Sequence, residues 1–127
     1  MDENSITKII VSSAYKIHTD LGPGLFESVY EVILTNELLI HNLKVERQKA
    51  IPIIYNQMEF PEGFRVDLVV ENKVLIELKS VEEISKIHKK QLLTYLRLTN
   101  LKLGLLINFG SVLIKDGIFR IVNGLPE

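Results

Sequence analysis

The segment FRVDLVV, residues 64–70, decides the fold together with the apolar run VLIELK, residues 74–79. Both segments are rich in β-branched and other apolar residues and so predict two strands joined by a tight turn. Asp67, Glu77 and Lys79 therefore lie inside strands, where desolvating a charged side chain costs on the order of several kcal/mol unless it is paired or binds a metal ion. A divalent cation would hold these three groups together, because it takes carboxylate oxygens as ligands.

The turn between the two strands determines whether the two carboxylates meet. Because side chains alternate along a strand, a three-residue turn at 71–73 would place Asp67 directly across from Glu77, with Cβ atoms about 5 Å apart. A two-residue turn at 72–73 would instead put the acids on opposite faces of the sheet. The metal hypothesis therefore requires the longer or a bulged turn, for which Asn72 can adopt the left-handed conformation. Alternation also predicts one face made of Val66, Leu68 and Val70 and an opposite face made of Arg65, Asp67 and Val69.

An ion-paired strand surface, in which Lys79 neutralises the two acids, explains the same residues without a metal. Glu-x-Lys is a common pattern, and the chain contains a second copy at Glu71-Asn72-Lys73. That copy falls in the predicted turn, where it would be solvated and structural. Only the copy inside a strand, with Asp67 ten residues before Glu77, points to a site. Both interpretations remain open from these residues alone.

Two expected helices carry further candidates. On a helix over 85–98, Gln91 and Tyr95 lie four residues apart and share a face, so they could contact a phosphate or a water near a metal. The alternative is a polar stripe whose hydrogen bonds are satisfied by the backbone. Glu27 falls in the first turn of a helix over 27–40, where interaction with the helix dipole, worth about 0.3–1 kcal/mol, also explains an acid.

Basic residues cluster in one part of the chain, although the formal net charge is −1. Five basic residues and no acidic one occur between Lys86 and Lys102. On the expected helix these could follow a nucleic-acid backbone, or they could form an ordinary solvated face. The residues in question on that helix are Lys86, Lys89, Lys90 and Arg97.

Composition limits the class of protein. The chain has 127 residues, 46% hydrophobic and 24% charged, which predicts a single folded domain over 1–127 rather than a disordered chain. The absence of cysteine excludes disulfides, thiol nucleophiles and cysteine-bound zinc. No apolar run is long enough to span a membrane, so we expect no membrane contact and a cytoplasmic location.

The order of predicted elements indicates a mixed sheet flanked by helices. The first helix should stop at Gly22-Pro23, and Pro52 marks an edge strand. The expected helices are 6–21, 27–40 and 85–98. The expected strands are 45–55, 64–71, 74–79 and 103–109, with a polar loop over 56–63 and a terminal hairpin of 112–114 and 118–122 turning at 115–117.

Together these residues resemble the PD-(D/E)xK nuclease superfamily, in which a helix-borne Glu, a strand Asp, a Glu-x-Lys and a Gln-x-x-x-Tyr follow in this order. A closer resemblance, over about residues 5–122, is to the GxxExxY family of small prokaryotic proteins. The motifs that carry it are Gly24-x-x-Glu27-x-x-Tyr30, Tyr55, Asp67, Glu77-x-Lys79, Gln91-x-x-x-Tyr95 and Leu106-Ile107-Asn108-Phe109-Gly110. The resemblance implies an α/β fold with a restriction-endonuclease-like core, a central mixed β-sheet flanked by α-helices.

The resemblance also implies a role for each site residue. The ligands of Mg²⁺, or of Mn²⁺ in its place, would be the acids Glu27, Asp67 and Glu77 and the main-chain carbonyl of Leu78. Lys79 would orient the attacking water and stabilise developing negative charge. Gln91 and Tyr95 would support the phosphate or the water shell of the metal. The chain departs from the pattern at Val66, where the superfamily has a proline before the aspartate.

Three functions are compatible with the sequence. The first is a nuclease-like phosphodiesterase dependent on Mg²⁺ or Mn²⁺ and acting on nucleic acid, with DNA expected rather than RNA. The second is a catalytically silent module of the same fold that binds nucleic acid or protein. The third is an interaction protein whose strand charges form a salt-bridge network. Since a small neutral chain binds nucleic acid weakly alone, a homodimer or a protein partner is also expected.

Overall fold

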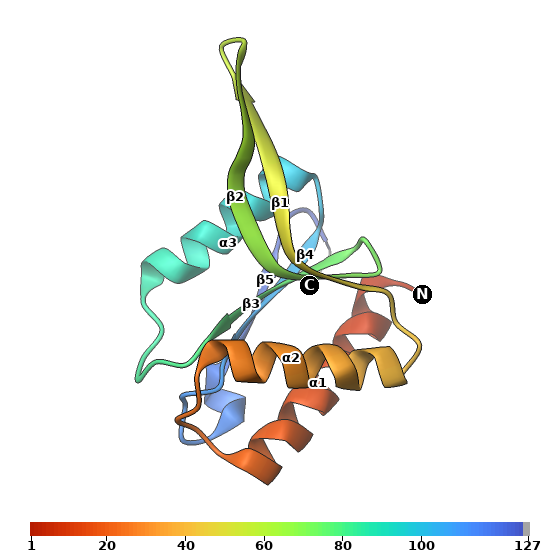
Figure 1. The fold of residues 1–127 in the computed structure, drawn as a ribbon, viewed down its shortest axis with the longest axis vertical. Helices are drawn as coiled ribbons and strands as arrows, with labels where there is room; N and C mark the ends of the chain where they lie inside the picture. The colour runs from red at the N-terminus through yellow and green to blue at the C-terminus, as the bar shows by residue number, and fades with distance from the viewer. Residues whose placement is uncertain (126–127) are drawn as a thin grey trace.

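The computed structural model describes residues 1–125 and shows a mixed five-stranded sheet with helices on both faces (Figure 1). The strands lie in the order β1-β2-β3-β4-β5; β3 and β4 are parallel, and every other neighbouring pair is antiparallel. The helices are α1 (Glu3–Leu21), α2 (Glu27–Ile40) and α3 (Lys86–Thr99). The strands are β1 (Val45–Tyr55), β2 (Met58–Val70), β3 (Val74–Lys79), β4 (Leu103–Asn108) and β5 (Ile118–Val122). The predicted α/β class is therefore confirmed.

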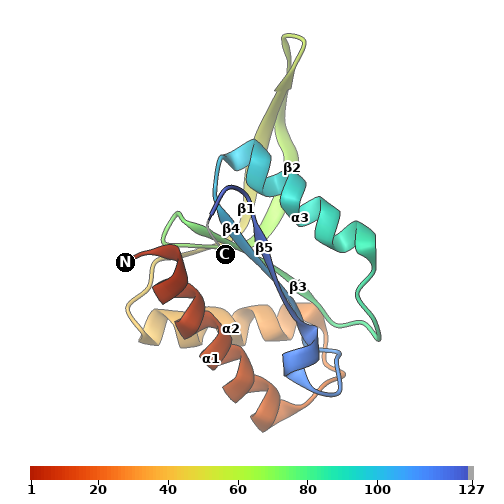
Figure 2. The ribbon, with the colours of Figure 1, turned by 180° about the vertical axis from the view of Figure 1, so that it is seen from behind.

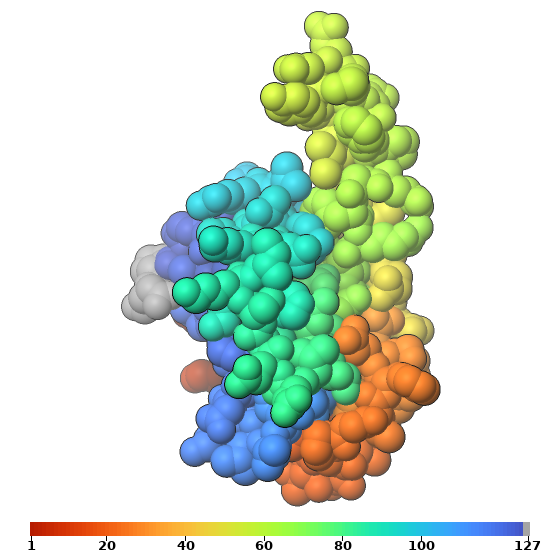
Figure 3. Space-filling view, turned by 90° about the vertical axis from the view of Figure 1, so that its left-hand side faces the viewer, coloured from red at the N-terminus to blue at the C-terminus, as the bar shows by residue number. Residues whose placement is uncertain are grey.

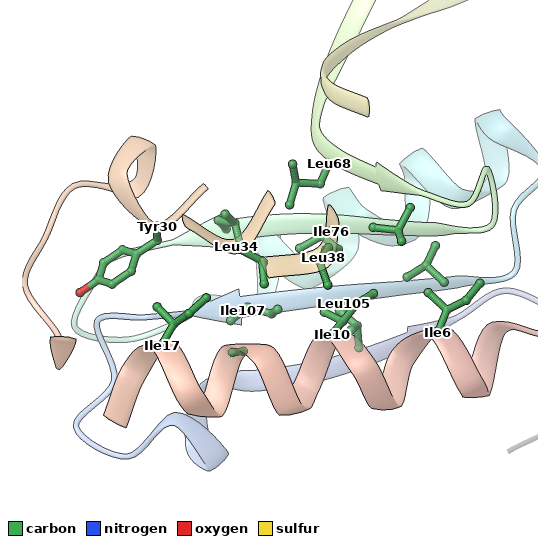
Figure 4. Packing of buried hydrophobic residues seen from close by; sticks show 14 of the residues in the cluster. Ile6, Ile10, Ile17, Tyr30, Leu34, Leu38, Leu68, Ile76, Leu105 and Ile107 are labelled. Carbon is green, nitrogen blue, oxygen red and sulfur yellow. The ribbon is translucent and has the colours of Figure 1, made fainter. Parts of the chain in front are cut away.

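Helices α1 and α2 pack on one face of the sheet, and α3 packs on the other (Figure 2). Figure 4 shows the first core, where Ile6, Ile10 and Ile17 of α1 point toward the sheet. Their helical spacing explains why α1 buries one side only. The second core lies under α3, around Leu92 and Leu96. Because each face of the sheet is covered, β3 and β4 are almost wholly buried, and a charge on β3 is costly unless it has a partner.

The β1–β2 hairpin extends past the rest of the sheet as an arm (Figures 1 and 3). We call residues 53–60 the arm tip. The predicted polar loop over 56–63 is wrong, because β2 already begins at Met58 and only Asn56 and Gln57 form the turn. Both turn residues have positive φ, 48° and 66°, as a two-residue hairpin turn requires. The arm tip is largely exposed and carries apolar side chains, Ile54, Tyr55, Met58 and Phe60, beside the two polar turn residues.

The C-terminal part also differs from the prediction. Residues 112–114 do not form a strand; a short 3₁₀ helix, η1 (Ile114–Gly117), stands where the hairpin turn was expected. β5 pairs instead with β4, with Phe119 opposite Leu106. The buried side chain of Ile114 joins the core under α1, which explains its apolar character without a strand. Within residues 1–125, no helix has the length and apolar character needed to cross a membrane.

Candidate metal and phosphodiester site

The turn between β2 and β3 is the three-residue turn that the metal hypothesis requires. Val70 pairs with Val74, and Glu71 and Asn72 have φ of 55° and 54°. The N–H of Lys73 closes the turn by donating to the carbonyl of Val70 over 3.0 Å. The register therefore runs toward a pairing of Asp67 with Glu77, as the sequence predicted.

The backbone pairing of β2 with β3 ends one residue before Asp67 and Glu77, and side-chain hydrogen bonds replace it there. The last paired residues are Leu68 and Ile76. Beyond them, the N–H of Asp67 donates to Glu77 Oε1 over 3.1 Å, and the N–H of Leu78 donates to Asp67 Oδ2 over 2.8 Å. The two carboxylates thus bridge β2 and β3 by hydrogen bonds at the place where the backbone pairing has ended, and we call this place the opening between β2 and β3.

The main-chain carbonyl of Leu78 faces the same opening. Successive residues of a strand direct their N–H and C=O groups to alternate sides. The carbonyl of Lys79 accepts from Phe109 N over 2.9 Å on the β4 side. The N–H of Leu78 points the other way, to Asp67, and its carbonyl shares that direction.

Burial raises the pKa of both carboxyl groups. Burial, together with the neighbouring Asp67 carboxylate, raises the pKa of Glu77 from 4.5 to about 8. Burial also raises the pKa of Asp67, although hydrogen bonds from Leu78 and Gln48 oppose the shift. Two neighbouring acids with raised pKa values are typical of a metal site, because a bound cation would stabilise their ionised forms.

Three residues for which the sequence predicted no role, Gln48, Glu31 and Arg47, form a hydrogen-bonded chain that ends at Asp67. The side-chain nitrogen of Gln48 donates to Asp67 Oδ1 over 3.0 Å and to Glu31 Oε1 over 2.6 Å. Arg47 donates from Nε and a terminal nitrogen to Glu31 Oε2, over 3.2 and 3.1 Å. Glu31, only 6% exposed, follows Glu27 by one helical turn, and that spacing was the available signal.

The path of β2 changes at Asp67. Leu68 and Val70 pack under α1 and α2, as alternation predicts, but Val66 packs with Val69 in the core under α3. The predicted face of Val66 is therefore wrong. Opposite Asp67, Gln48 has φ of 48°, and the β1–β2 register has a gap at this position. A left-handed residue twists the strand pair locally, which alternation cannot foresee.

Glu27 approaches the opening from the start of α2, but its carboxylate is held at the end of β3. Its Oε2 accepts from Ser80 N over 3.2 Å. Its negative charge raises the pKa of both Asp67 and Glu77, although it is not the main cause in either case. The start of α2 is fixed by Tyr30, whose hydroxyl donates to the carbonyl of Gly22 over 2.5 Å.

The stacking of Tyr30 on Phe109 also links this region to the end of β4. The ring centroids are 4.4 Å apart, with an interplanar angle of 5°. Beside them, a depression of about 750 Å³ is bordered by Glu27, Ser80 and Gly110, among others. Neither Asp67 nor Glu77 lines this depression.

Lys79 lies half-buried on the β3 face that carries Glu77, and its charge lowers the pKa of that acid without overcoming burial. No salt bridge within residues 1–125 includes Asp67, Glu77 or Lys79. The acids are held by N–H groups instead, so the alternative of an ion-paired strand surface does not describe this site.

Helix α3 contributes Tyr95 on the same side of the sheet. Tyr95 stacks on Phe64 with centroids 4.1 Å apart. Burial raises the pKa of its hydroxyl, and the charges of Glu77 and Asp67 add to this shift. Gln91 is exposed one turn earlier, and its amide forms no hydrogen bond with residues 1–125. At the start of the same helix, Ser85 N donates to His88 Nδ1 over 3.3 Å.

The predicted basic residues divide into two groups. Lys86, Lys90 and Arg97 are exposed on the outer side of α3 (Figure 3 shows this helix beside the arm). Lys89 is half-buried, with its ammonium 4.0 Å above the ring of Phe119. We call the exposed group, Lys86, Lys90 and Arg97, the basic face of α3.

The acids do not form a closed cage. Among residues 1–125, no three His, Cys, Asp or Glu side chains are close enough to hold a metal ion together. The expected triad of Glu27, Asp67 and Glu77 is therefore not assembled. Mg²⁺ needs only one or two carboxylates and keeps several waters, so Asp67, Glu77 and the Leu78 carbonyl fit its chemistry.

Comparison with models of protein families matches residues 4–121 to the PD-(D/E)XK nuclease superfamily. Comparisons with curated proteins and with solved structures gave no significant match.

Proposed function

We propose, from the premise that this chain belongs to the PD-(D/E)XK nuclease superfamily, that it hydrolyses phosphodiester bonds of nucleic acid with Mg²⁺ or Mn²⁺. The observation that supports this most is the opening between β2 and β3, where Asp67, Glu77 and the Leu78 carbonyl meet. The finer parts of the proposal are DNA rather than RNA as substrate, one domain over 1–127, membership of the GxxExxY family, and a cytoplasmic location in a prokaryote.

The proposed metal ligands are Asp67, Glu77 and the Leu78 carbonyl, with Glu27 as a more distant acid. A divalent cation bound here would supply the positive charge that acidifies water and neutralises the phosphate. Asp67 and Glu77 each retain a carboxylate lone pair for this purpose, because each oxygen can accept more than one partner. Loss of the proton from Glu77 is part of binding, since its pKa is about 8.

Lys79 is proposed to hold the attacking water and to stabilise the charge that develops on the phosphate. The absence of any salt bridge to Lys79 among the described residues supports this role, because its ammonium is not committed elsewhere. Tyr95 and Gln91 are proposed to contact the phosphate from α3. The stacking on Phe64 restricts the ring of Tyr95, and a restricted group loses less entropy on binding.

We propose that nucleic acid follows the basic face of α3, with Lys89 in a lesser role. Exposed ammonium and guanidinium groups contribute to phosphate binding without reading the base sequence. With a net charge of −1, the chain as a whole has little electrostatic attraction for nucleic acid, so a second copy or a protein partner is expected to add affinity.

A catalytically silent binding module of the same fold is the second candidate, and it is favoured by one observation. Glu27 is tied to Ser80 and does not join Asp67 and Glu77 in a three-acid group within residues 1–125. Incubation of the purified protein with single- and double-stranded DNA and RNA, each with Mg²⁺ and with Mn²⁺, separates the two. Cleavage that is lost in Lys79→Ala supports the nuclease; retention of the substrate without cleavage supports the module.

A further inference from the structure

We propose that Gln48 is a positioning residue, which holds the Asp67 carboxylate in place for a divalent cation by linking it to Glu31. The inference rests on the proposed function of this site. Gln48 belongs to none of the motifs that indicated a nuclease, and it comes from β1, the edge strand, rather than from the strands that carry the acids.

The contacts of Gln48 define which end of its amide faces the acids. Its side-chain nitrogen lies 2.6 Å from Glu31 Oε1 and 3.0 Å from Asp67 Oδ1. A carboxylate accepts hydrogen bonds and cannot donate them, so the NH₂ group, and not the carbonyl, must point at both. The amide thus gives one proton to each acid.

The carboxylate of Glu31, to which Gln48 also donates, is itself buried and held in place. It is 6% exposed, and Arg47 binds its other oxygen with two nitrogens. The Arg47 charge offsets the Glu31 charge, and a two-nitrogen contact restricts the direction of the carboxylate. A rigid anchor on α2 is therefore connected, through one amide, to the carboxylate of Asp67 on β2.

The opposite oxygen of Asp67 is held as well. Leu78 N donates to Oδ2 over 2.8 Å, while Gln48 donates to Oδ1. With one hydrogen bond on each oxygen, the carboxylate cannot rotate freely, yet each oxygen keeps a lone pair for a cation. Hydrogen bonds of this kind to metal ligands orient the ligand and tune its affinity for the metal.

The backbone of Gln48 has an unusual conformation at the position where its side chain contacts the two acids. Its φ is 48°, a left-handed value that non-glycine residues seldom adopt inside a strand. The guanidinium of Arg65 donates to the Gln48 carbonyl over 3.0 Å and holds this conformation. Strained residues of this type collect at functional sites, where the surrounding structure supports them.

Gln48→Met and Gln48→Asn test the inference in complementary ways. Methionine keeps the length of the side chain and removes both donors. Asparagine keeps an amide and tolerates positive φ better, but it is one methylene too short to bridge the two acids. Gln57→Met is the matched control, because Gln57 lies on the same hairpin with φ of 66° but is exposed and contacts neither acid.

The readouts are the dissociation constant for Mn²⁺, measured by calorimetry on the full chain, and the melting temperature without metal. We expect both Gln48 variants to bind Mn²⁺ about 10- to 100-fold more weakly, as removal of a partner of a metal ligand does elsewhere. Gln57→Met should match the wild type. Without metal, both Gln48 variants should melt below Gln57→Met, because the buried Glu31 carboxylate loses one hydrogen-bond donor in each. Mn²⁺ binding is therefore measured at a temperature at which every variant is folded.

Two results would overturn the inference, and they are distinguishable from each other. If the wild type binds Mn²⁺ and Gln48→Asn binds it equally well, Gln48 acts only through its backbone conformation and the proposed function stands. If the wild type binds no Mn²⁺, the proposed metal site itself is wrong, and the positioning role is wrong with it.

Discussion

Asp67 and Glu77 each bind the main chain beside the other: Asp67 N–H donates to Glu77 Oε1 over 3.1 Å, and Asp67 Oδ2 accepts from Leu78 N over 2.8 Å. This exchange fixes two buried acids at the end of a strand ladder. It also makes the site part of the fold, because the same carboxylates replace the missing backbone hydrogen bonds between β2 and β3.

Divalent cations should stabilise the protein through these acids. At a concentration 100-fold above the dissociation constant, Mg²⁺ or Mn²⁺ should raise the free energy of unfolding by about 2.7 kcal/mol. Asp67→Asn should melt no lower than the metal-free wild type, because it removes a repulsive charge, and it should not respond to metal. Thermal melts of both proteins, without metal and with each cation at about 100 times its dissociation constant, measure the shift in melting temperature. A wild-type melting temperature that ignores both cations would contradict the site.

The stability of the metal-free protein should depend on pH through Glu77. Its pKa is 4.5 when exposed and about 8 in the folded state, so between these values the folded state binds the extra proton. The stabilisation from Glu77 is complete below about pH 4.5 and is lost as pH rises toward 8 and above.

The matching variant is Glu77→Gln, which cannot titrate. In urea titrations across pH 5–9, the unfolding free energy of the variant should decline much less than that of the wild type, with Asp67 as the remaining contributor. Glu59→Gln, on the exposed arm tip, should keep the full decline. Equal slopes for the wild type and Glu77→Gln would show that Glu77 ionises normally.

Lys79→Ala should abolish metal-dependent cleavage while leaving the metal-induced rise in melting temperature nearly intact. Lys79 stabilises charge present mainly in the transition state, and loss of one such group costs about 10²- to 10³-fold in rate. Lys73→Ala, in the second Glu-x-Lys of the turn, should change neither property; the Lys73 ammonium donates to the carbonyl of Met1 over 2.6 Å. Equal cleavage by the wild type and Lys79→Ala would assign the activity to a contaminant or another site.

Binding of nucleic acid should depend on salt through the basic face of α3. The slope of the logarithm of affinity against the logarithm of salt concentration should become shallower by about 0.7 to 0.9 for each phosphate that the protein no longer neutralises. The triple alanine variant of Lys86, Lys90 and Arg97 should therefore have a shallower slope than the wild type. Lys8→Ala is the control, because Lys8 is exposed on α1, which covers the face of the sheet opposite to α3. Fluorescence anisotropy with labelled DNA, without divalent metal, measures the slopes. An unchanged slope in the triple variant would mean that nucleic acid binds at a different surface.

The sequence predicted the parts of the fold that depend on local chemistry. Gly22, with φ of 73°, ends α1 where Gly22-Pro23 was expected to stop it. The turn at 71–73 was predictable as a condition of the metal hypothesis, and Asn72 adopts the left-handed conformation expected of it. The mixed sheet followed from the order of helices and strands.

The parts that the sequence did not predict depend on long-range contacts. The start of β2 was missed because residues 58–63 are few and include Pro61 and Gly63, two residue types that are typical of loops. Gln48 and Glu31 were missed because their roles appear only when α2, β1 and β2 come together. Glu27 was predicted at the right helix start, but its hydrogen bond to Ser80 could not be foreseen, since 53 residues separate the two.

The most direct test of the proposed metal site is a crystal of the wild-type protein soaked in Mn²⁺ and measured at the manganese absorption edge. We predict an anomalous peak between the carboxylates of Asp67 and Glu77 and next to the carbonyl of Leu78, which is absent in Asp67→Asn. An opening without a peak between β2 and β3, in crystals that bind Mn²⁺ elsewhere or not at all, would contradict the site.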